Sequence, residues 1–289
     1  MSKDVENSQD HYKDASDIYH SAFFYTGDYE SWQLDILLKA LDLKESDKLA
    51  DIGGGTGRFA SLIYKHARLN NPVMCLGTSP EMLSPAQQLE GVNTLCCNAV
   101  EFSQLKDDIC YDSILMKEVV HHLSEKDLRA TLSSLVQKLS KKGKLTICTR
   151  PHIVEYPFFQ AAHEVWKRNQ PPKEHYVSLL EQSGYRIISV DVFPYPAKLN
   201  VSWWISMVQQ RFWSTFSEFN DEELALGVEE IKRRKDMAKA KFLKGINTSS
   251  ANQNQISLAK KSRGFTSRVL DEDNPFFMKK TTYLANDPT

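Results

Sequence analysis

The stretch Asp51-Ile52-Gly53-Gly54-Gly55-Thr56-Gly57 lies between a short apolar run, residues 48–52, and a helical pattern, residues 59–66. The run before it predicts a strand, and the periodic apolar residues after it predict a helix. Glycines at such a turn let the backbone approach a ligand closely, and the first N–H groups of the following helix are free to donate. Because ligands of open α/β sheets bind where strands end, the stretch predicts a ligand site.

Two common phosphate-binding turns do not fit this stretch. The P-loop pattern G-x-x-x-x-G-K-[ST] occurs nowhere in the chain. The dinucleotide pattern G-x-G-x-x-G fails because its sixth position, counted from Gly53, is Arg58. The spacing that fits is acid-x-Gly-x-Gly-x-Gly, with Asp51, Gly53, Gly55 and Gly57.

Strand-like and helix-like segments alternate from residue 48 to residue 193, which predicts parallel βαβ units with helices on both faces of one sheet. We expect strands at residues 48–52, 73–76, 93–97, 113–116, 144–149, 185–193 and 276–285, and helices at residues 32–42, 59–66, 80–89, 125–139, 175–183 and 201–244. Right-handed crossovers then restrict the fold to a doubly wound α/β topology.

Composition divides the chain into three parts. Residues 1–39 are polar with spaced aromatic side chains and predict an N-terminal helical cap, whereas residues 40–195 contain the alternating segments. Residues 196–289 predict a C-terminal helical cap, a polar loop over residues 245–275, and a strand that returns to the edge of the sheet.

The composition excludes several classes of protein. The 289 residues have a formal net charge of -1, whereas domains built for nucleic acid are usually strongly basic. No stretch approaches the roughly 20 apolar residues of a membrane helix, and the polar N-terminus lacks the apolar region of a secretory signal. We therefore expect a cytoplasmic protein without a membrane partner.

The cysteines are expected to be structural. Their number, five, is odd and no C-x-x-C pair occurs, so the chain predicts neither a disulfide framework nor a zinc site. Cys75, Cys96, Cys97 and Cys148 fall in strand-like segments and are expected to be small buried apolar residues.

The acid-and-glycine spacing resembles motif I of the class I S-adenosylmethionine-dependent methyltransferases, in the small-molecule branch that includes the ubiquinone-biosynthesis C-methyltransferases. Further matching segments follow in the family's order, at residues 79–83, 98–101, 111–114, 120–123 and 143–145. The resemblance implies a Rossmann-like sheet of seven strands whose last strand is antiparallel. It also implies S-adenosyl-L-methionine as cofactor and S-adenosyl-L-homocysteine as product.

The resemblance assigns cofactor-binding roles residue by residue. Asp51 would lie near the cofactor's amino group, and the glycines of the turn would line its methionine and ribose. The whole implied set is Asp51, Gly53, Gly54, Gly55, Gly57, Gly77, Thr78, Ser79, Met82, Asn98, Ala99, Val100, Lys117 and Glu118.

Two positions depart from the family's pattern. The acid that normally ends the second strand and accepts from the ribose hydroxyls is replaced by Gly77. Hydrogen bonds to charged groups contribute about 1.5–3 kcal/mol, so this change predicts cofactor binding weakened roughly 10- to 100-fold unless Thr78 or Ser79 compensates. The acid near the adenine is replaced by Asn98, whose carbonyl oxygen can still accept from the adenine amine.

The candidate catalytic residues follow the fourth and fifth strands. His121 and His122 titrate near neutrality and suit a general base; alternatively, one ring packs and the other bonds the backbone. Arg150 can clamp an anionic acceptor through its guanidinium, or it is an ordinary surface residue. Glu118 either bonds the cofactor or is solvated. No metal is required for transfer from a sulfonium.

The resulting hypothesis is methyl transfer to an O, N or C atom of a small molecule, enclosed by the two caps. A second hypothesis is a non-catalytic binding or scaffold protein of the same fold, because Gly77 lacks the ribose acceptor. A macromolecular substrate is a third: residues 229–280 contain 13 Lys or Arg against six Asp or Glu. We do not expect nucleic acid as a partner, because no aromatic residues interleave with the basic run 232–235. The sequence does not indicate the oligomeric state.

Overall fold

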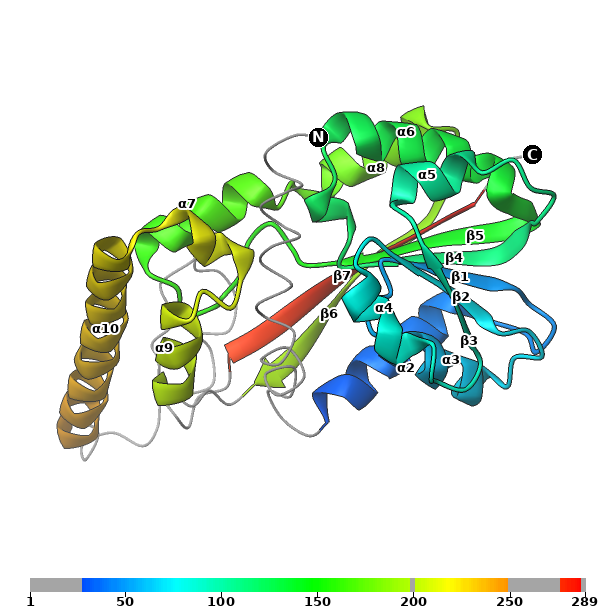
Figure 1. Cartoon of the computed structure of the whole chain (residues 1–289). Helices are drawn as coiled ribbons and strands as arrows, with labels where there is room; N and C mark the ends of the chain where they lie inside the picture. Colours follow the sequence, from blue (N-terminus) through cyan, green and yellow to red (C-terminus); the bar gives the residue numbers. More distant parts are fainter. Residues whose placement is uncertain (1–27, 198–200, 249–275, 287–289) are drawn as a thin grey trace. The chain divides into compact units, whose positions relative to one another are not determined.

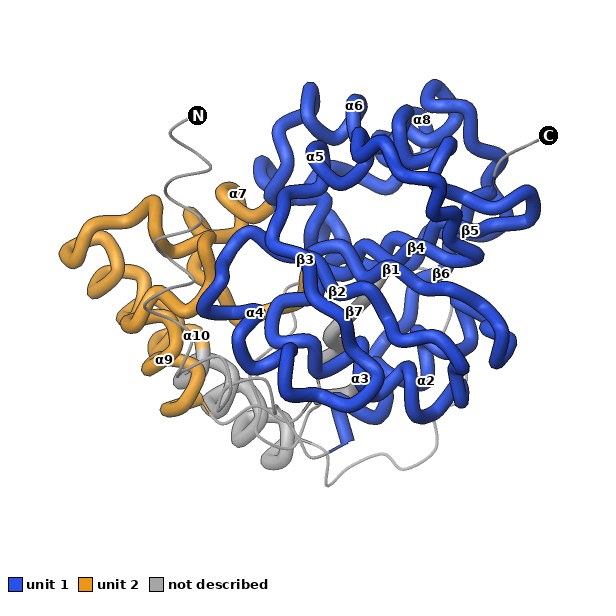
Figure 2. The backbone as a smooth tube through the Cα atoms, turned by 45° about the vertical axis from the view of Figure 1, so that its right-hand side comes forward, with its two compact units in different colours: residues 1–153, 167–195, 279–289 blue, residues 154–166, 196–278 orange. Residues whose placement is uncertain are grey.

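The computed structural model describes residues 28–197, 201–248 and 276–286 (Figure 1). The chain divides into two compact units (Figure 2). The first contains residues 1–153, 167–195 and 279–289, and the second contains residues 154–166 and 196–278. The glycine turn belongs to the first unit, together with all or most of every strand.

A seven-stranded sheet forms the centre of the first unit. Its strands are β1 (Leu49–Ile52), β2 (Val73–Gly77), β3 (Val92–Cys96), β4 (Tyr111–Lys117), β5 (Leu139–Thr149), β6 (Arg186–Ala197) and β7 (Phe276–Asn286). They are ordered β3-β2-β1-β4-β5-β7-β6. The pairs from β3 to β5 are parallel and β7 is antiparallel to β5, which confirms the predicted mostly parallel, doubly wound fold with an antiparallel last strand.

The returning strand does not lie where the sequence predicts it. β7 pairs with β5 on one side and lies next to β6 on the other, so it is internal, and β6 is the edge strand. The predicted edge position was wrong because a local pattern of apolar residues does not encode strand order. The apolar character of β7 fits its internal place: Tyr283 is 2% exposed and Ala285 is fully buried.

Helices cover both faces of the sheet. In the first unit they are α2 (Tyr29–Leu41), α3 (Arg58–Ala67), α4 (Pro80–Ala86), α5 (Ala99–Gln104), α6 (Glu125–Leu135) and α8 (Lys173–Gln182). α2, α3 and α4 pack on one face through residues such as Leu37, Ile63 and Leu83. α5, α6 and α8 pack on the other through residues such as Phe102, Leu132 and Leu179.

Side-chain caps explain where three of these helices begin. Ser79 Oγ accepts from the backbone N–H of Met82 at the start of α4, and Ser124 Oγ accepts from Asp127 at the start of α6. Asn98 and Glu101 form a reciprocal capping box at the start of α5. Each cap satisfies backbone donors that have no partner within the helix. α5 itself was missed by the sequence analysis, because six residues are too few for a periodic pattern.

The second unit is mainly helical. Its helices are α7 (Gln160–Asn169, whose last residues belong to the first unit), α9 (Val201–Gln209) and α10 (Asp221–Thr248). The single helical pattern predicted over residues 201–244 is thus broken by a 3₁₀ turn at Ser214–Glu218. Phe158 lies at the centre of an aromatic core, within 6.1 Å of the ring centroids of Trp166, Trp204, Trp213 and Phe216. No helix of the described residues is long and apolar enough to cross a bilayer.

Candidate functional site

The glycine turn connects β1 to α3 and leaves no room for side chains at three of its positions. Gly53 has a φ of +73°, and a Cβ there would lie 2.3 Å from Val119 Cγ2. A Cβ on Gly54 would lie 2.7 Å from Asp51 Oδ2, and one on Gly57 would lie 2.6 Å from the Cβ of Ala86. These distances are shorter than real side chains tolerate, so the turn requires glycine for close packing as well as for its backbone angles.

Asp51 supplies a buried carboxylate beside this turn. Its side chain is 1% exposed, and neither carboxylate oxygen has a hydrogen-bond partner among the described residues. Burial raises the pKa of Asp51 to about 7, and the positive charge of Lys117 partly opposes that rise. A buried carboxylate without partners is costly, so its presence here indicates a site for a cation or a hydrogen-bond donor.

Lys117 ends β4 next to the turn. Its Nζ lies 4.4 Å from the ring centroid of Phe59, the second residue of α3. In the β1–β4 register Asp51 is opposite Leu115, so Lys117, two residues further, projects to the same face as Asp51. The two charges therefore lie on one side of the sheet, at the carboxyl end of the central strands.

The end of β2 shows whether glycine is required at position 77. The nearest atom to a Cβ on Gly77 would be Leu83 Cδ2 at 3.5 Å, an ordinary van der Waals distance, and Gly77 does not have a positive φ. The space around Gly77 therefore accepts a Cβ atom. The suggested compensation by Ser79 is weakened because its hydroxyl already caps α4 and donates to Glu81. Thr78 is exposed.

The end of β3 holds Asn98, Ala99 and Val100. The carbonyl oxygen of Asn98 accepts from the Glu101 N–H at 2.9 Å, and its backbone N–H donates to the Glu101 carboxylate at 2.9 Å. An amide oxygen has two lone pairs, so this cap leaves capacity for one further donor. Cys96 is exposed in the same segment, against the sequence prediction of burial, because it lies at the last position of the strand.

The carboxyl ends of β4 and β5 bring three predicted residues together. Arg150 Nε donates to Glu118 Oε2 at 2.5 Å, and Arg150 Nη2 lies 3.1 Å from His121 Nε2. The Glu118 and Arg150 side chains are 12% and 13% exposed. Glu118 has a φ of +59°, a strained conformation for a residue with a side chain, which is concentrated at functional sites.

His121 has a neighbour at each ring nitrogen. Its Nε2 lies 3.1 Å from Arg150 Nη2, and its Nδ1 lies 3.4 Å from Thr149 Oγ1. The His122 ring centroid lies 4.0 Å from that of His121. Both predicted imidazoles therefore lie at the Glu118–Arg150 pair.

Neighbouring polar groups were missed by the sequence analysis. His152 Nδ1 lies 2.6 Å from the carbonyl oxygen of Gln170, and the buried Gln170 side-chain oxygen has no partner among the described residues. The Tyr176 hydroxyl is also buried without a partner in the described part of the chain, and burial and the charge of Glu118 raise the pKa of Tyr176. Their positions after β5 and in α8 have no pattern in the sequence that indicates a site.

Two residues of the basic run 232–235, Lys232 and Arg234, pair within the second unit. Lys232 Nζ donates to Glu229 Oε1 at 2.7 Å, and Arg234 pairs with Glu230 and donates to the carbonyl oxygen of Phe158 at 3.0 Å. Such pairs on one helix are typical of a solvated face.

Comparison with known proteins matches part of the chain to a family model. Residues 50–145 match the family model described as a methyltransferase domain. A putative methyltransferase of an antibiotic biosynthesis pathway from Anabaena variabilis has a similar structure, with TM-score 0.57 and 16% identity over 86% of this chain and 95% of that one. A putative methyltransferase from Bacillus halodurans has TM-score 0.52 and 14% identity over 89% and 99%.

A third similar structure comes from an enzyme with bound ligands. The phosphoethanolamine N-methyltransferase 2 of Haemonchus contortus, in complex with phosphomonomethylethanolamine and S-adenosylhomocysteine, has TM-score 0.51 and 15% identity, over 90% of this chain and 53% of that one. No curated protein matches the chain. The domain match includes the glycine turn and the strands that surround Asp51, so this part of the chain is similar to a methyltransferase domain.

Proposed function

We propose that the protein transfers the methyl group of S-adenosylmethionine to a small-molecule acceptor bound at the carboxyl ends of β4 and β5. The observation that carries this proposal is the Glu118–Arg150–His121 cluster, a set of polar side chains that are mostly buried. A buried polar cluster at strand ends suits an enclosed small molecule, whereas a macromolecule needs an exposed surface.

The cofactor roles of individual residues are part of the proposal. Asp51, when ionised, would accept from the ammonium group of the cofactor's methionine, because its oxygens have no other partner in the described chain. The tight turn at Gly53, Gly54, Gly55 and Gly57 would let the backbone contact the cofactor. The other predicted contacts are Gly77, Thr78, Ser79, Met82, Asn98, Ala99, Val100, Lys117 and Glu118.

The acceptor would be oriented by the cluster. Arg150 contacts Glu118 and His121 at this end of the sheet, and its planar guanidinium matches the geometry of a carboxylate or phosphate on the acceptor. His121 or His122 would act as general base for acceptors that lose a proton. Methyl transfer itself needs mainly an in-line arrangement of donor and acceptor atoms.

Calorimetric titration with S-adenosylmethionine and S-adenosylhomocysteine tests the cofactor half of the proposal. We expect one site, abolished in Gly55→Arg, where a long side chain enters the space next to Met82. Gly77→Asp should tighten binding about tenfold, because the position accepts a Cβ and a carboxylate restores acceptors for the ribose. Absence of heat and of a thermal shift in the wild-type protein would contradict the cofactor assignment.

A screen of acceptors tests the other half. S-Adenosylhomocysteine release would be measured with small amines, hydroxy acids and phosphorylated amino alcohols, including phosphomonomethylethanolamine, the ligand of the nematode enzyme. Arg150→Lys should raise KM more for anionic acceptors than for neutral ones, because lysine loses the planar fork. Release only with RNA or protein acceptors would contradict a small-molecule function.

A further inference from the structure

The end of β2 is the part of the site that faces the ribose of a bound cofactor. β2 is parallel to β1, and the Gly54 N–H donates to the carbonyl oxygen of Leu76 at 3.0 Å, so the glycine turn is attached to the last residues of β2. In doubly wound sheets that bind a nucleoside beside such a turn, an acid about 20 residues further on accepts from a ribose hydroxyl. In this chain the residue at that place is Gly77.

The space next to Gly77 has an apolar wall. The three heavy atoms nearest to a Cβ at this position all belong to Leu83, at 3.5, 3.6 and 3.9 Å. Leu83 is 2% exposed and belongs to the apolar core on this face of the sheet. The residue before it, Met82, has its Cε 3.5 Å from the corresponding Cβ position of Gly55. Through these two side chains, the first turn of α4 presents hydrocarbon to the glycine turn and to the end of β2.

The backbone carbonyls at the end of β2 are directed within the sheet. The Leu76 oxygen accepts from the N–H of Gly54, which follows β1. The Gly77 oxygen accepts from the N–H of Cys97, which follows β3, at 3.0 Å. Both carbonyl groups therefore point sideways to the neighbouring strand ends, and they do not take the place of a carboxylate that projects from the sheet.

The nearby carboxylate of Glu81 does not replace the missing acid. Ser79 Oγ accepts from the Met82 N–H and donates to Glu81 Oε2 at 2.8 Å, so this hydroxyl is used within α4. Successive residues of a helix are about 100° apart around its axis. Because Met82 faces the glycine turn and Leu83 faces Gly77, Glu81 lies on the side of α4 that faces away from both, and it is exposed.

We propose that the cofactor site does not select for the ribose hydroxyls and accepts S-adenosyl compounds that lack them. Gly77 is the residue that determines this specificity, because its missing side chain leaves the apolar wall of Leu83 where a carboxylate would otherwise project. Recognition then depends on the two ends of the cofactor, at Asp51 and Asn98. This specificity rests on the cofactor roles proposed above and does not depend on the identity of the methyl acceptor.

Calorimetric titration with S-adenosylhomocysteine and with its 2′,3′-dideoxy analogue tests the specificity without any methyl acceptor. In the wild-type protein, the analogue should bind no more than about threefold more weakly, because removal of the hydroxyls then loses no hydrogen bond to the protein. In Gly77→Asp, S-adenosylhomocysteine should bind about tenfold more tightly than in the wild type, whereas the analogue should gain nothing. The ratio of the two dissociation constants is thus the measured quantity.

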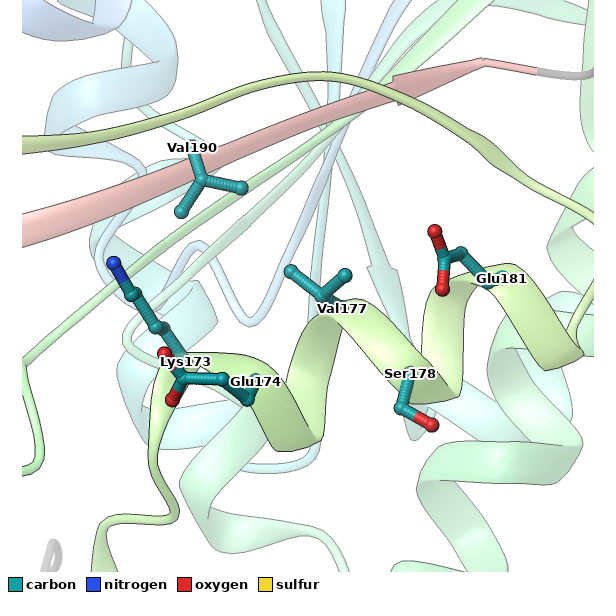
Figure 3. Close-up of a pocket in the computed structure, with 6 residues that line it drawn as sticks. All are labelled: Lys173, Glu174, Val177, Ser178, Glu181 and Val190. Atoms are coloured by element: carbon teal, nitrogen blue, oxygen red, sulfur yellow. The ribbon is translucent and has the colours of Figure 1, made fainter.

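Ser178→Asp is the matched control, because it introduces the same carboxylate far from β2. Ser178 lies on α8 and, with Val190 of β6, lines a groove of about 290 Å³ (Figure 3). β6 and β3 are the two edges of the sheet, and β2 is next to β3. The control should therefore leave the dissociation constants of both compounds as they are in the wild-type protein.

Three outcomes distinguish the possible failures. A wild-type protein that binds the analogue tenfold or more weakly than S-adenosylhomocysteine would overturn the proposal, and loss of that difference in Thr78→Val would assign the ribose contact to the Thr78 hydroxyl instead. Equal affinities for the two compounds in a folded Gly77→Asp protein would also overturn it. If the wild type binds neither compound, the cofactor assignment itself is wrong. The wild-type comparison needs no variant, so it decides even where Gly77→Asp fails to fold.

Discussion

The two buried carboxylates at the carboxyl end of the sheet differ in one respect. Glu118, after β4, is paired with a guanidinium at 2.5 Å, whereas Asp51, in β1, has no hydrogen-bond partner in the described residues. Both are shielded from water, but only Asp51 is left with the unfavourable free energy of an unpaired buried charge, and its pKa rises to about 7. The difference teaches that Glu118 has a partner within the protein, whereas Asp51 leaves both oxygens for the ligand that we propose.

The largest effect expected from this difference concerns cofactor affinity. Asp51→Asn should weaken S-adenosylmethionine binding about 10- to 100-fold, because a charge-assisted hydrogen bond to the ammonium is lost. Calorimetry measures the affinity, and the melting temperature should stay the same or rise because the substitution removes a buried charge. If the affinity is unchanged, the interpretation of Asp51 as the open ligand site is wrong.

The next effect is a dependence of cofactor affinity on pH. With a pKa of about 7 in the unliganded protein, Asp51 is mostly ionised above pH 7 and mostly protonated below it. The ammonium of the cofactor binds the ionised form, so the dissociation constant should rise about tenfold for each unit below pH 7. The groups facing Asp51 are Lys117, whose positive charge opposes the rise in the pKa of Asp51, and Cys75, whose pKa is raised by burial. The same slope in Asp51→Asn would refute the assignment.

The third prediction concerns the folding stability that the Glu118–Arg150 pair contributes. Arg150→Met leaves the Glu118 carboxylate without its guanidinium and should destabilise the protein by about 2 kcal/mol. A lower melting temperature with little change in cofactor affinity would separate the two regions clearly. The double variant Arg150→Met/Glu118→Gln is the control, since removing both charges should recover part of the loss. Equal stability of the single variant and the wild type would show that the pair is not a structural unit.

The smallest expected effect is on folding stability, at two buried tyrosines. The Tyr185 hydroxyl donates to the carbonyl oxygen of Leu132 at 3.0 Å, whereas the Tyr176 hydroxyl has no partner in the described residues. Tyr185→Phe should therefore cost about 1 kcal/mol, and Tyr176→Phe should cost nothing or stabilise slightly. Thermal melts of the two variants side by side measure this. A larger loss in Tyr176→Phe than in Tyr185→Phe would indicate that Tyr176 already has a structural partner.

Most of the fold in the first unit could be predicted from local patterns. The strands β1 to β5, the helices α3, α4 and α6 between them and the glycine turn follow from the spacing of apolar residues, glycines and capping residues, which act within a few positions along the chain. The errors in the predicted helices arise where such short-range patterns are missing or are overridden by packing. α5 is too short for periodicity, and the break at Ser214–Glu218 depends on packing of Phe216 in the aromatic core rather than on a helix-breaking residue.

The candidate site likewise has residues that the sequence indicated and contacts that it did not. The chain alone indicated Asp51 and the glycines, because close backbone approach needs glycine at fixed intervals after a strand. It did not indicate that Arg150 pairs with Glu118 and contacts His121, because Arg150 is 32 and 29 positions from them and meets them only when β4 and β5 lie side by side. The place of β7 between β5 and β6, and the groove that β6 forms with α8, likewise depend on strand order. Contacts between distant residues are made by the packed sheet, and local propensity does not encode them.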